Sequence, residues 1–221
     1  MTDANHGTSS LEIVYAVAGL KAAGKGEFGK RLAERFGFTV LTYSTPIRAV
    51  AERELGFEAD GKTPKYKVAD LVRIADRERA VNGPGYWSTP LLEIANARGI
   101  QRLVVDGFRN PGEIVTLQRS VGPETKLVLV GIIAPFDIRC ARAQKRLQSG
   151  DPLTVDGFRH MDEVDRGIGQ PEHGQQVDKC LAMVAPENLY DNAGTLDAYH
   201  GWIDGRAMRD LEGNAPTARQ S

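Results

Sequence analysis

The chain has 221 residues, 41% of them hydrophobic, and its 28 basic and 29 acidic residues leave a net charge of −1. A chain of this length and composition can form one α/β domain with a full core, and its balanced charge argues against a broad nucleic-acid-binding face. No apolar run approaches the roughly 20 residues of a membrane span, and the first ten residues lack the features of a signal peptide, so we expect a cytoplasmic protein with no membrane partner.

Apolar stretches that suit buried strands alternate along the chain with amphipathic helical patterns. The predicted strands are 11–18, 38–42, 102–106, 126–133 and 180–184. The predicted helices are 27–36, 46–55, 65–81, 89–98, 111–120, 135–149, 156–167 and 194–204. This alternation predicts an α/β fold in which a five-stranded parallel sheet carries helices on both faces, forming a three-layer sandwich. The polar segments 1–10 and 205–221 are predicted to be disordered ends, which leaves one domain over 11–204.

A phosphate-binding motif follows the first strand. The segment GLKAAGK at 19–25 has the spacing G-x-x-x-x-G-K between a buried strand and an amphipathic helix, which is the setting of a phosphate-binding loop (P-loop). Its glycines let successive amides point at phosphate oxygens, and the following helix adds the positive end of its dipole. A glycine-rich turn that binds nothing is the alternative. The residues expected to hold ATP are Gly19, Lys21, Ala22, Ala23, Gly24, Lys25, Gly26 and Glu27.

Magnesium handling depends on the two residues after Lys25. Gly26 stands where this motif usually has the Ser or Thr that ligates Mg²⁺, and the carboxylate of Glu27 follows. The run GLKAAGKG resembles the loop of adenylate kinases, which also place Gly directly after the Lys but have Thr at the position of Glu27. Because Mg²⁺ can be held by substrate phosphates and one carboxylate, ATP and Mg²⁺ are the expected cofactors, and Glu27 is a candidate metal ligand.

The second strand leads into a helix whose first turn could bind an anion. The run STPIR at 44–48 places Pro46 and then Arg48 at the start of this helix. In monophosphate kinases this position resembles the start of the helix that binds the acceptor nucleotide, which implies that Ser44, Thr45 and Arg48 contact the acceptor. A capped helix with a solvated arginine is the alternative.

The segment 56–98 is interpreted as a helical insertion that binds the acceptor. It carries several cations and aromatic side chains, which can bind phosphate and stack on a base. Arg79 and Trp87 are the substrate-binding candidates of this segment. Trp87 could equally fill the core, because an isolated tryptophan is usually mostly buried.

An acidic residue ends the strand at 102–106. Its carboxylate, Asp106, would lie beside the phosphates, where it can hold a magnesium-bound water, and Arg109 offers a guanidinium fork suited to phosphate. The run DGFR at 106–109 resembles the DGFPR motif of adenylate kinases without its proline. We therefore predict that Asp106 is a catalytic residue and metal ligand and that Arg109 binds substrate. The alternative is that Asp106 caps a turn and Arg109 is solvated.

Three arginines lie on one face of the helix predicted over 135–149, because their offsets of three and four residues match the helical repeat. They are Arg139, Arg142 and Arg146. If this helix leads into a short lid at 148–152, as in the kinases, Arg142 and Arg146 would neutralise the transferred phosphoryl group and Arg139 would hold substrate. A solvated basic face with ion pairs to Asp137 or Asp151 is the alternative.

From about residue 13 to 203 the chain resembles P-loop nucleoside and deoxynucleoside monophosphate kinases of the adenylate and dephospho-coenzyme A kinase type. The pattern is most similar to the kinase-like domain at the N-terminus of phage-defence deoxycytidine nucleotide deaminases. The residues that carry this likeness are the P-loop, DGFRNPGE at 106–113, the arginine helix, Asp162 with Glu163, GQQVDKC at 174–180, and Asn192. The chain has neither the C-x-x-C nor the H-x-E of a zinc deaminase, so the resemblance does not extend to deamination.

The resulting hypothesis is an ATP-dependent phosphotransferase whose acceptor is a (deoxy)nucleoside monophosphate. Lys25 would bind the β- and γ-phosphates, Asp106 would position magnesium or the acceptor, and arginines would stabilise the transferred group. The expected partner is a small nucleotide, although a hydroxyl of a nucleic acid stays open as acceptor, as does the oligomeric state. The alternative is a nucleotide-sensing P-loop module that regulates a partner without efficient transfer, which the unusual Gly26 and Glu27 support.

Overall fold

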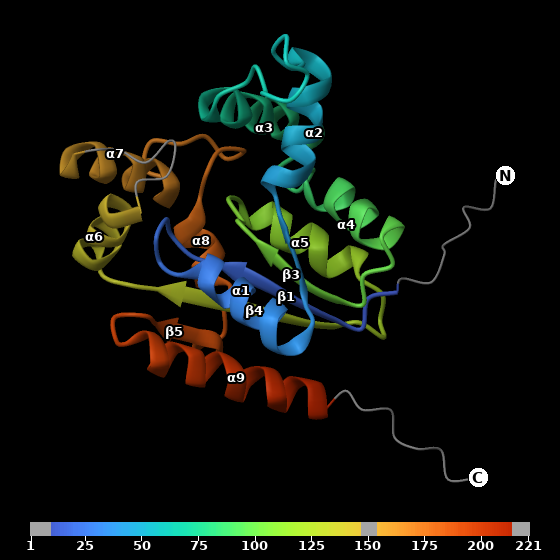
Figure 1. Ribbon diagram of the computed structural model, residues 1–221, viewed down its shortest axis with the longest axis vertical. Helices are drawn as coiled ribbons and strands as arrows, with labels where there is room; N and C mark the ends of the chain where they lie inside the picture. Colours follow the sequence, from blue (N-terminus) through green and yellow to red (C-terminus); the bar gives the residue numbers. More distant parts are fainter. Residues whose placement is uncertain (1–9, 147–153, 214–221) are drawn as a thin grey trace, which may run out of the picture.

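The computed structural model describes residues 10–146 and 154–213 (Figure 1). In this part of the chain, five strands form one parallel sheet in the order β2-β3-β1-β4-β5. Their bounds are β1 (Ile13–Ala18), β2 (Thr39–Thr42), β3 (Arg102–Asp106), β4 (Lys126–Ile133) and β5 (Leu189–Asp191). The strands predicted at 102–106 and 126–133 form with the predicted bounds, and those at 11–18 and 38–42 form with shorter ones.

Nine helices of the described chain surround the sheet, and every predicted helix forms. They are α1 (Lys25–Phe36), α2 (Ser44–Leu55), α3 (Val68–Asn82), α4 (Ser88–Ala97), α5 (Pro111–Ser120), α6 (Phe136–Arg146), α7 (Val155–Arg166), α8 (Val177–Ala182) and α9 (Leu196–Glu212). Local signals fix several boundaries. For example, Asn110 caps α5 by accepting a hydrogen bond from the Gly112 amide, and Pro111 occupies the first helical position.

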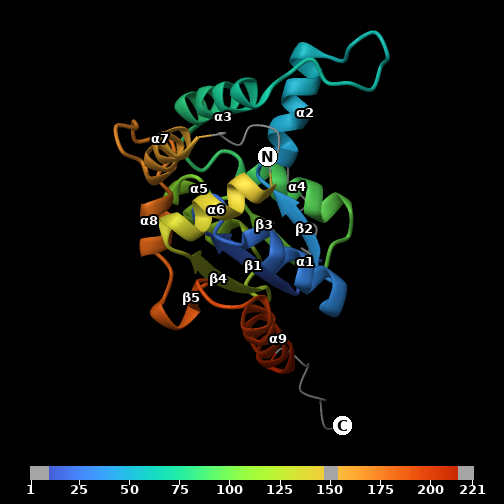
Figure 2. The same ribbon diagram turned by 60° about the vertical axis from the view of Figure 1, so that its left-hand side comes forward.

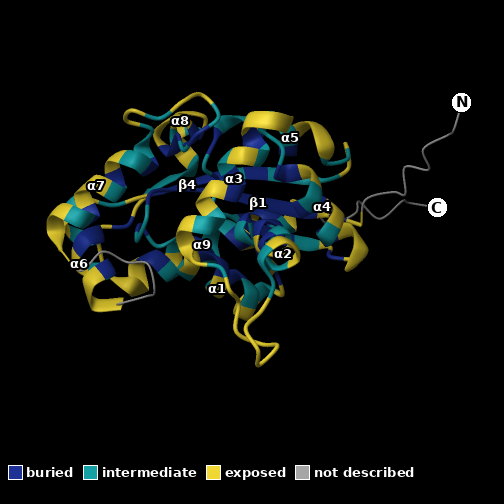
Figure 3. Cartoon of the chain, turned by 90° about the horizontal axis from the view of Figure 1, so that it is seen from above, coloured by how far each residue is buried: buried dark blue, intermediate teal, exposed yellow. Residues whose placement is uncertain are grey.

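Strand β1 lies at the centre of the sheet, and each of its two faces belongs to a different core. Val14, Ala16 and Ala18 pack in the cluster that includes α4, α5 and α8, whereas Ile13, Tyr15 and Val17 pack with α1 and α9. All six residues are buried, as expected for a strand that is covered on both faces. Figures 2 and 3 show the sheet between its two helical layers, with the buried residues concentrated along β1 and β4. The predicted three-layer α/β sandwich is confirmed.

The strand predicted at 180–184 is wrong, because most of this segment belongs to a helix. Helix α8 ends at Ala182, with Val177 and Cys180 buried at helical spacing, and β5 comes later at Leu189–Asp191. The run from Cys180 to Val184 is a short apolar stretch, and periodicity alone cannot separate a buried strand from one buried helical turn.

The disordered tail predicted from residue 205 is also corrected, since α9 continues to Glu212. Its polar residues serve a buried network, which is why composition misled the prediction. Asp210 accepts hydrogen bonds from the Tyr15 hydroxyl at 2.7 Å and from Arg206 Nε at 2.6 Å, and Ala207 is fully buried. The predicted disordered start (1–10) except Ser10, the predicted lid (148–152) and the end of the tail (214–221) lie outside the described residues.

The segment interpreted as an insertion, 56–98, divides between two surroundings. Helix α4 packs in the main core through Leu91, Leu92 and Ala95, whereas α3 packs on α2 and reaches the same core through Ile74 and Ala75. Figures 1 and 2 place α2 and α3 away from the sheet layers. Helix α3 of this segment therefore projects beside α2, where it could face an acceptor.

Candidate nucleotide-binding site

The P-loop connects β1 to α1 in a tight curve that only certain residues permit. Gly24 has a left-handed backbone with φ 118°, and a Cβ placed on it would lie 2.3 Å from Asn192 Nδ2, so no side chain fits there. Ala22 also has a left-handed backbone, with φ 60°, which an L-residue adopts at a cost. The loop is thus held in a conformation that its sequence alone does not favour.

Side chains from distant parts of the chain hold the loop through its carbonyl groups. Each carbonyl from Leu20 to Gly24, Ala22 excepted, accepts a side-chain hydrogen bond. The donors are Lys25 Nζ to Leu20 at 3.2 Å, Arg139 Nη1 to Lys21 at 3.3 Å, Asn192 Nδ2 to Ala23 at 2.8 Å and the Tyr199 hydroxyl to Gly24 at 3.1 Å. The first amides of α1 have no partner within the helix, so the same end of the helix is suited to an anion.

Lys25 lies half-buried at the start of α1. Burial lowers the pKa of its ammonium group, and the neighbouring Asp106 carboxylate offsets part of that effect. The ammonium thus lies in a poorly hydrated place where one carboxylate compensates only part of the cost of its charge. The negative charge of a polyphosphate would compensate the rest.

Asp106 is the last residue of β3 and pairs with Val17 of β1, which is the strand that leads into the P-loop. Its Oδ1 is buried and has no hydrogen-bond partner among the described residues. Buried carboxylate oxygens are normally satisfied, so this atom fits a group that a ligand would bring, such as a magnesium-bound water. The prediction for Asp106 thus has a physical basis in the structure.

The predicted role of Glu27 as a metal ligand is not supported, because its carboxylate is engaged elsewhere. Glu27 Oε1 lies 2.7 Å from His200 Nε2, so the pair joins α1 to α9. Among the described residues, no group of three or more His, Cys, Asp or Glu side chains could hold a metal ion. Asp106 is therefore the remaining protein candidate for magnesium.

The start of α2 lies beside Asp106, as the acceptor interpretation requires. The Tyr43 amide donates to the Asp106 carbonyl at 3.1 Å, and the hydroxyls of Ser44 and Thr42 lie 2.6 Å apart. Arg48 is exposed one turn into the helix. The structure therefore brings Ser44 and Thr45 to the same end of the sheet as the P-loop.

Arg109 joins the charged groups at this end of the sheet. Its Nη1 lies 2.8 Å from Asp165 Oδ2 on α7. Burial alone would lower the pKa of the Arg109 guanidinium, but the carboxylates of Asp165 and Asp106 raise it above its usual value. Asp165 is not among the predicted site residues; its position three residues after Asp162 on an amphipathic helix was the available signal.

Two of the predicted substrate-binding residues, Arg79 and Trp87, are structural. Arg79 is 2% exposed and pairs with Glu113 at 3.0 Å and with Asp76 at 2.8 Å. Trp87 is 1% exposed, and its Nε1 donates to the Ala75 carbonyl at 3.1 Å. Neither side chain has a surface left for a nucleotide, so both predictions are wrong.

The three arginines predicted on one face of a helix, now α6, have different surroundings. Arg139 is fully buried and bound to Asp162, so its predicted contact with substrate is wrong. Arg142 is half-buried and donates to the carbonyls of Asn192 at 2.9 Å and Ala23 at 3.5 Å. Arg146 is exposed at the end of α6 and acts electrostatically on Lys25. Arg142 and Arg146 therefore lie near the loop, as predicted.

Sequence comparisons with known proteins show which family the chain is similar to. No family model matches the chain. A UPF0200 protein of Sulfurisphaera tokodaii is 30% identical over 162 residues, which cover 72% of this chain and 82% of the relative. A UPF0200 protein of Methanoculleus marisnigri is 30% identical over 165 residues, covering 75% of this chain and 84% of the relative.

Two solved structures share the fold at low sequence identity. TT1252 from Thermus thermophilus has a TM-score of 0.54 at 14% identity, covering 92% of this chain and 97% of its own. A "putative kinase" from Chloroflexus aurantiacus has a TM-score of 0.50 at 12% identity, covering 92% and 99%. The five-stranded parallel α/β fold of this chain is thus shared with both structures. In the described residues no helix is both long and apolar enough to cross a membrane. On the evidence of its relatives, the chain belongs to the UPF0200 family.

Proposed function

We propose that this protein transfers the γ-phosphoryl group of ATP to a nucleotide-type acceptor, most simply a (deoxy)nucleoside monophosphate. The observation that carries the proposal is the unpartnered, buried Oδ1 of Asp106 beside Lys25 and the P-loop. A buried carboxylate oxygen that accepts no hydrogen bond is costly unless a ligand completes the site. The triphosphate of ATP with its magnesium ion is such a ligand.

Each nearby cation has a role in this proposal. Lys25 and the amides of the P-loop bind the β- and γ-phosphates, while Arg142 and Arg146 stabilise the charge of the transferred group. On the other side, Arg109 with Ser44, Thr45 and Arg48 holds the acceptor. The pairing of Arg109 with Asp165 keeps its guanidinium in place before the acceptor arrives.

Asp106 is the residue that would hold magnesium. The ion would neutralise phosphate charge, and it needs few protein ligands because it retains waters and binds phosphate oxygens. A single carboxylate with a free oxygen suits that requirement, and Gly26 leaves open space because a Cβ there would meet nothing within 4 Å.

The proposed reaction is an in-line displacement. An oxygen of the acceptor phosphate forms a bond to the γ-phosphorus, while the bond from that phosphorus to the β,γ-bridging oxygen breaks and its electron pair leaves with ADP. The acceptor phosphate is already ionised at neutral pH, so no protein base has to remove a proton. The work of the protein is then positioning and charge stabilisation.

The test is a transfer assay with γ-labelled ATP and Mg²⁺ against ribo- and deoxynucleoside monophosphates, modified nucleotides and dephospho-coenzyme A. Lys25→Ala should lower transfer by at least roughly 100-fold. The matched control is Lys30→Ala, since Lys30 is an exposed lysine of the same helix whose ion pair with Glu34 is long, at 3.9 Å. A labelled product that survives Lys25→Ala would contradict the proposal.

The second candidate is a nucleotide sensor, and one observation favours it. The first residue after Lys25 has no hydroxyl, and the carboxylate of the second is paired with His200, so magnesium would depend on Asp106 alone. A sensor would bind ATP or a deoxynucleotide tightly in calorimetry yet label no acceptor in the panel. Efficient labelling of one acceptor would rule this candidate out.

A further inference from the structure

The Lys21–Ala22 segment of the P-loop is held by a contact with the α6–α7 pair. Ala22 is the one non-glycine residue of the described chain with positive φ, at 60°. Its side chain packs against a small cluster of Cys140 and Ala143 from α6 and Phe158 from α7. Because an alanine alone disfavours this backbone conformation, the packing helps to maintain it.

The neighbouring residue, Lys21, is bound to the same two helices. Its carbonyl accepts a hydrogen bond from Arg139 Nη1 of α6 at 3.3 Å, and its Nζ lies 3.4 Å from Met161 Sδ of α7. The segment Lys21–Ala22 is thus fastened by its backbone and by both side chains.

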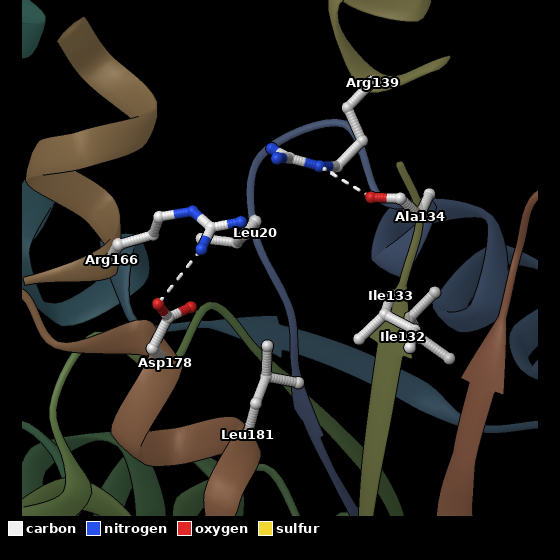
Figure 4. A pocket seen from close by; sticks show the side chains of 8 residues that line it. All are labelled: Leu20, Ile132, Ile133, Ala134, Arg139, Arg166, Asp178 and Leu181. Carbon is white, nitrogen blue, oxygen red and sulfur yellow. Dashed lines mark hydrogen bonds and ion pairs between the residues drawn. The ribbon is translucent and has the colours of Figure 1, made fainter. Parts of the chain in front are cut away.

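The contact depends on how Arg139 is itself fixed. Its guanidinium makes a two-pronged pair with Asp162 of α7, and its Nε donates to the Ala134 carbonyl at 3.0 Å. The rings of Phe136 and Phe158 each lie 5.9 Å from the guanidinium carbon. Figure 4 shows Arg139 above Ala134 at the end of β4, on the border of a cavity of about 230 Å³ that Leu20 also lines. A planar group held at this many points has one orientation.

We propose that Arg139 and Asp162 are positioning residues that set the P-loop in its phosphate-binding conformation. Neither would touch the nucleotide. Asp162 orients Arg139, Arg139 holds the Lys21 carbonyl outward, and the adjoining amides then face the phosphates. The inference rests on the proposed function only in that the ligand is a nucleoside triphosphate.

The test combines two substitutions that should compensate each other. Asp162→Asn removes the charge that fixes Arg139, so we expect the Kd for MgATP to rise about tenfold as Ala22 leaves its costly conformation. Ala22→Gly removes that cost, since glycine adopts positive φ readily. The double variant should therefore recover most of the lost affinity and bind more tightly than Asp162→Asn.

A ligand-free measurement reports on the loop directly. Hydrogen exchange of the amides at 20–24 should be faster in Asp162→Asn than in the wild type, while exchange in the β1 and β4 amides stays slow. Arg139→Lys is the second variant if Asp162→Asn fails to fold, because it keeps a cation beside the carboxylate and loses the fork. Arg139→Lys should also speed exchange of the amides at 20–24, and Ala22→Gly should again recover most of the lost MgATP affinity.

The matched control is Arg166→Gln. Arg166 binds the same carboxylate, with Nε 3.2 Å from Asp162 Oδ2, but makes no hydrogen bond to the P-loop among the described contacts. It should leave loop exchange and affinity unchanged. A purely structural role would lower the thermal stability of Asp162→Asn without speeding loop exchange. It could also weaken MgATP binding in a way that Ala22→Gly does not restore. Either result would overturn the proposal.

Failure of the proposed function looks different. If the wild type binds MgATP but transfers nothing, the affinity and exchange experiments still decide the positioning roles. If the wild type does not bind MgATP at all, the proposed function fails, and loop exchange in Asp162→Asn compared with Arg166→Gln decides the inference.

Discussion

Asn192 Nδ2 fills the space that any side chain at Gly24 would need, since a Cβ on Gly24 would lie 2.3 Å from that nitrogen. The same nitrogen donates to the Ala23 carbonyl at 2.8 Å. One side chain at the end of β5 therefore both shapes the P-loop and restricts its sequence.

We predict that Gly24→Ala weakens MgATP binding strongly and destabilises the fold by roughly 1–2 kcal/mol or more, because it adds a steric clash to a left-handed backbone. Calorimetry and urea unfolding measure the two effects. Gly26→Ala is the stability control. Its Cβ would meet nothing within 4 Å, so alanine in this helical position should stabilise by roughly 0.5–1 kcal/mol. Equal stability of the two variants would contradict the steric argument.

Asp106→Asn should separate binding from transfer. Since the Asp106 Oδ1 has no hydrogen-bond partner among the described residues, an amide of the same shape breaks no hydrogen bond of that atom and should leave the fold intact. Loss of its charge should lower the transfer rate by about 100-fold while MgATP still binds. Thermal unfolding and single-turnover assays test this, and an unchanged transfer rate would remove Asp106 from the site.

Acid should loosen α9 before the rest of the fold. The hydrogen bond from Arg31 holds the pKa of Asp204 below its ordinary value near 3.8; the pKa of Asp210 is also lowered, because hydrogen bonds from Arg206, Tyr15 and Lys126 outweigh the effect of burial. For a carboxylate with a lowered folded-state pKa, the stabilisation is complete above the unfolded-state pKa and is lost as pH falls through the folded-state value.

We therefore expect the free energy of unfolding to decrease once the pH is lowered past about 4. The fluorescence of Trp202, which packs against Tyr190, is the measurement that reports this change. Asp204→Asn should be less stable at pH 7 and should show a flatter dependence on acid. The control is Glu212→Gln, an exposed position at the end of the same helix. An identical acid profile in Asp204→Asn and the wild type would refute the assignment.

Glu113→Gln should cost about 3 kcal/mol, because it breaks the fully buried ion pair with Arg79 and leaves that guanidinium with Asp76 as its charged partner. The Glu113 carboxylate also accepts hydrogen bonds from the amides of Arg109 at 2.8 Å and Asn110 at 3.2 Å, so the loop after Asp106 should loosen as well. Urea unfolding measures the cost. The exposed Glu93 of α4 is the control, and Glu93→Gln should change stability by less than about 0.5 kcal/mol.

The parts of the site that the sequence predicted are those set by local order along the chain. The P-loop, Asp106 and the start of α2 each follow a strand directly, and the ends of parallel strands meet at one edge of the sheet. Arg79 and Trp87 were assigned wrongly because an arginine or tryptophan looks the same in a sequence whether it faces a ligand or a buried partner. The partner of Arg79, Glu113, is 34 residues away.

Pairings across the whole chain were beyond any local pattern. Glu27 meets His200 across 173 residues, and Asn192 meets Ala23 across 169. Such contacts follow from which helix covers which face of the sheet, and sequence periodicity gives the face of a helix but not its neighbour. The same limit hid Asp165 as the partner of Arg109.

The carbonyl contacts of the P-loop have a consequence for biosynthesis. Arg139, Asn192 and Tyr199 reach back to residues 21–24, so the motif emerges from the ribosome long before the groups that shape it. Distant contacts of this kind form late, and domains complete their packing only when their last elements are available. If the loop binds ATP as proposed, a growing chain that already contains the whole GLKAAGK motif would not yet hold a triphosphate, because Tyr199 of α9 has still to reach the Gly24 carbonyl.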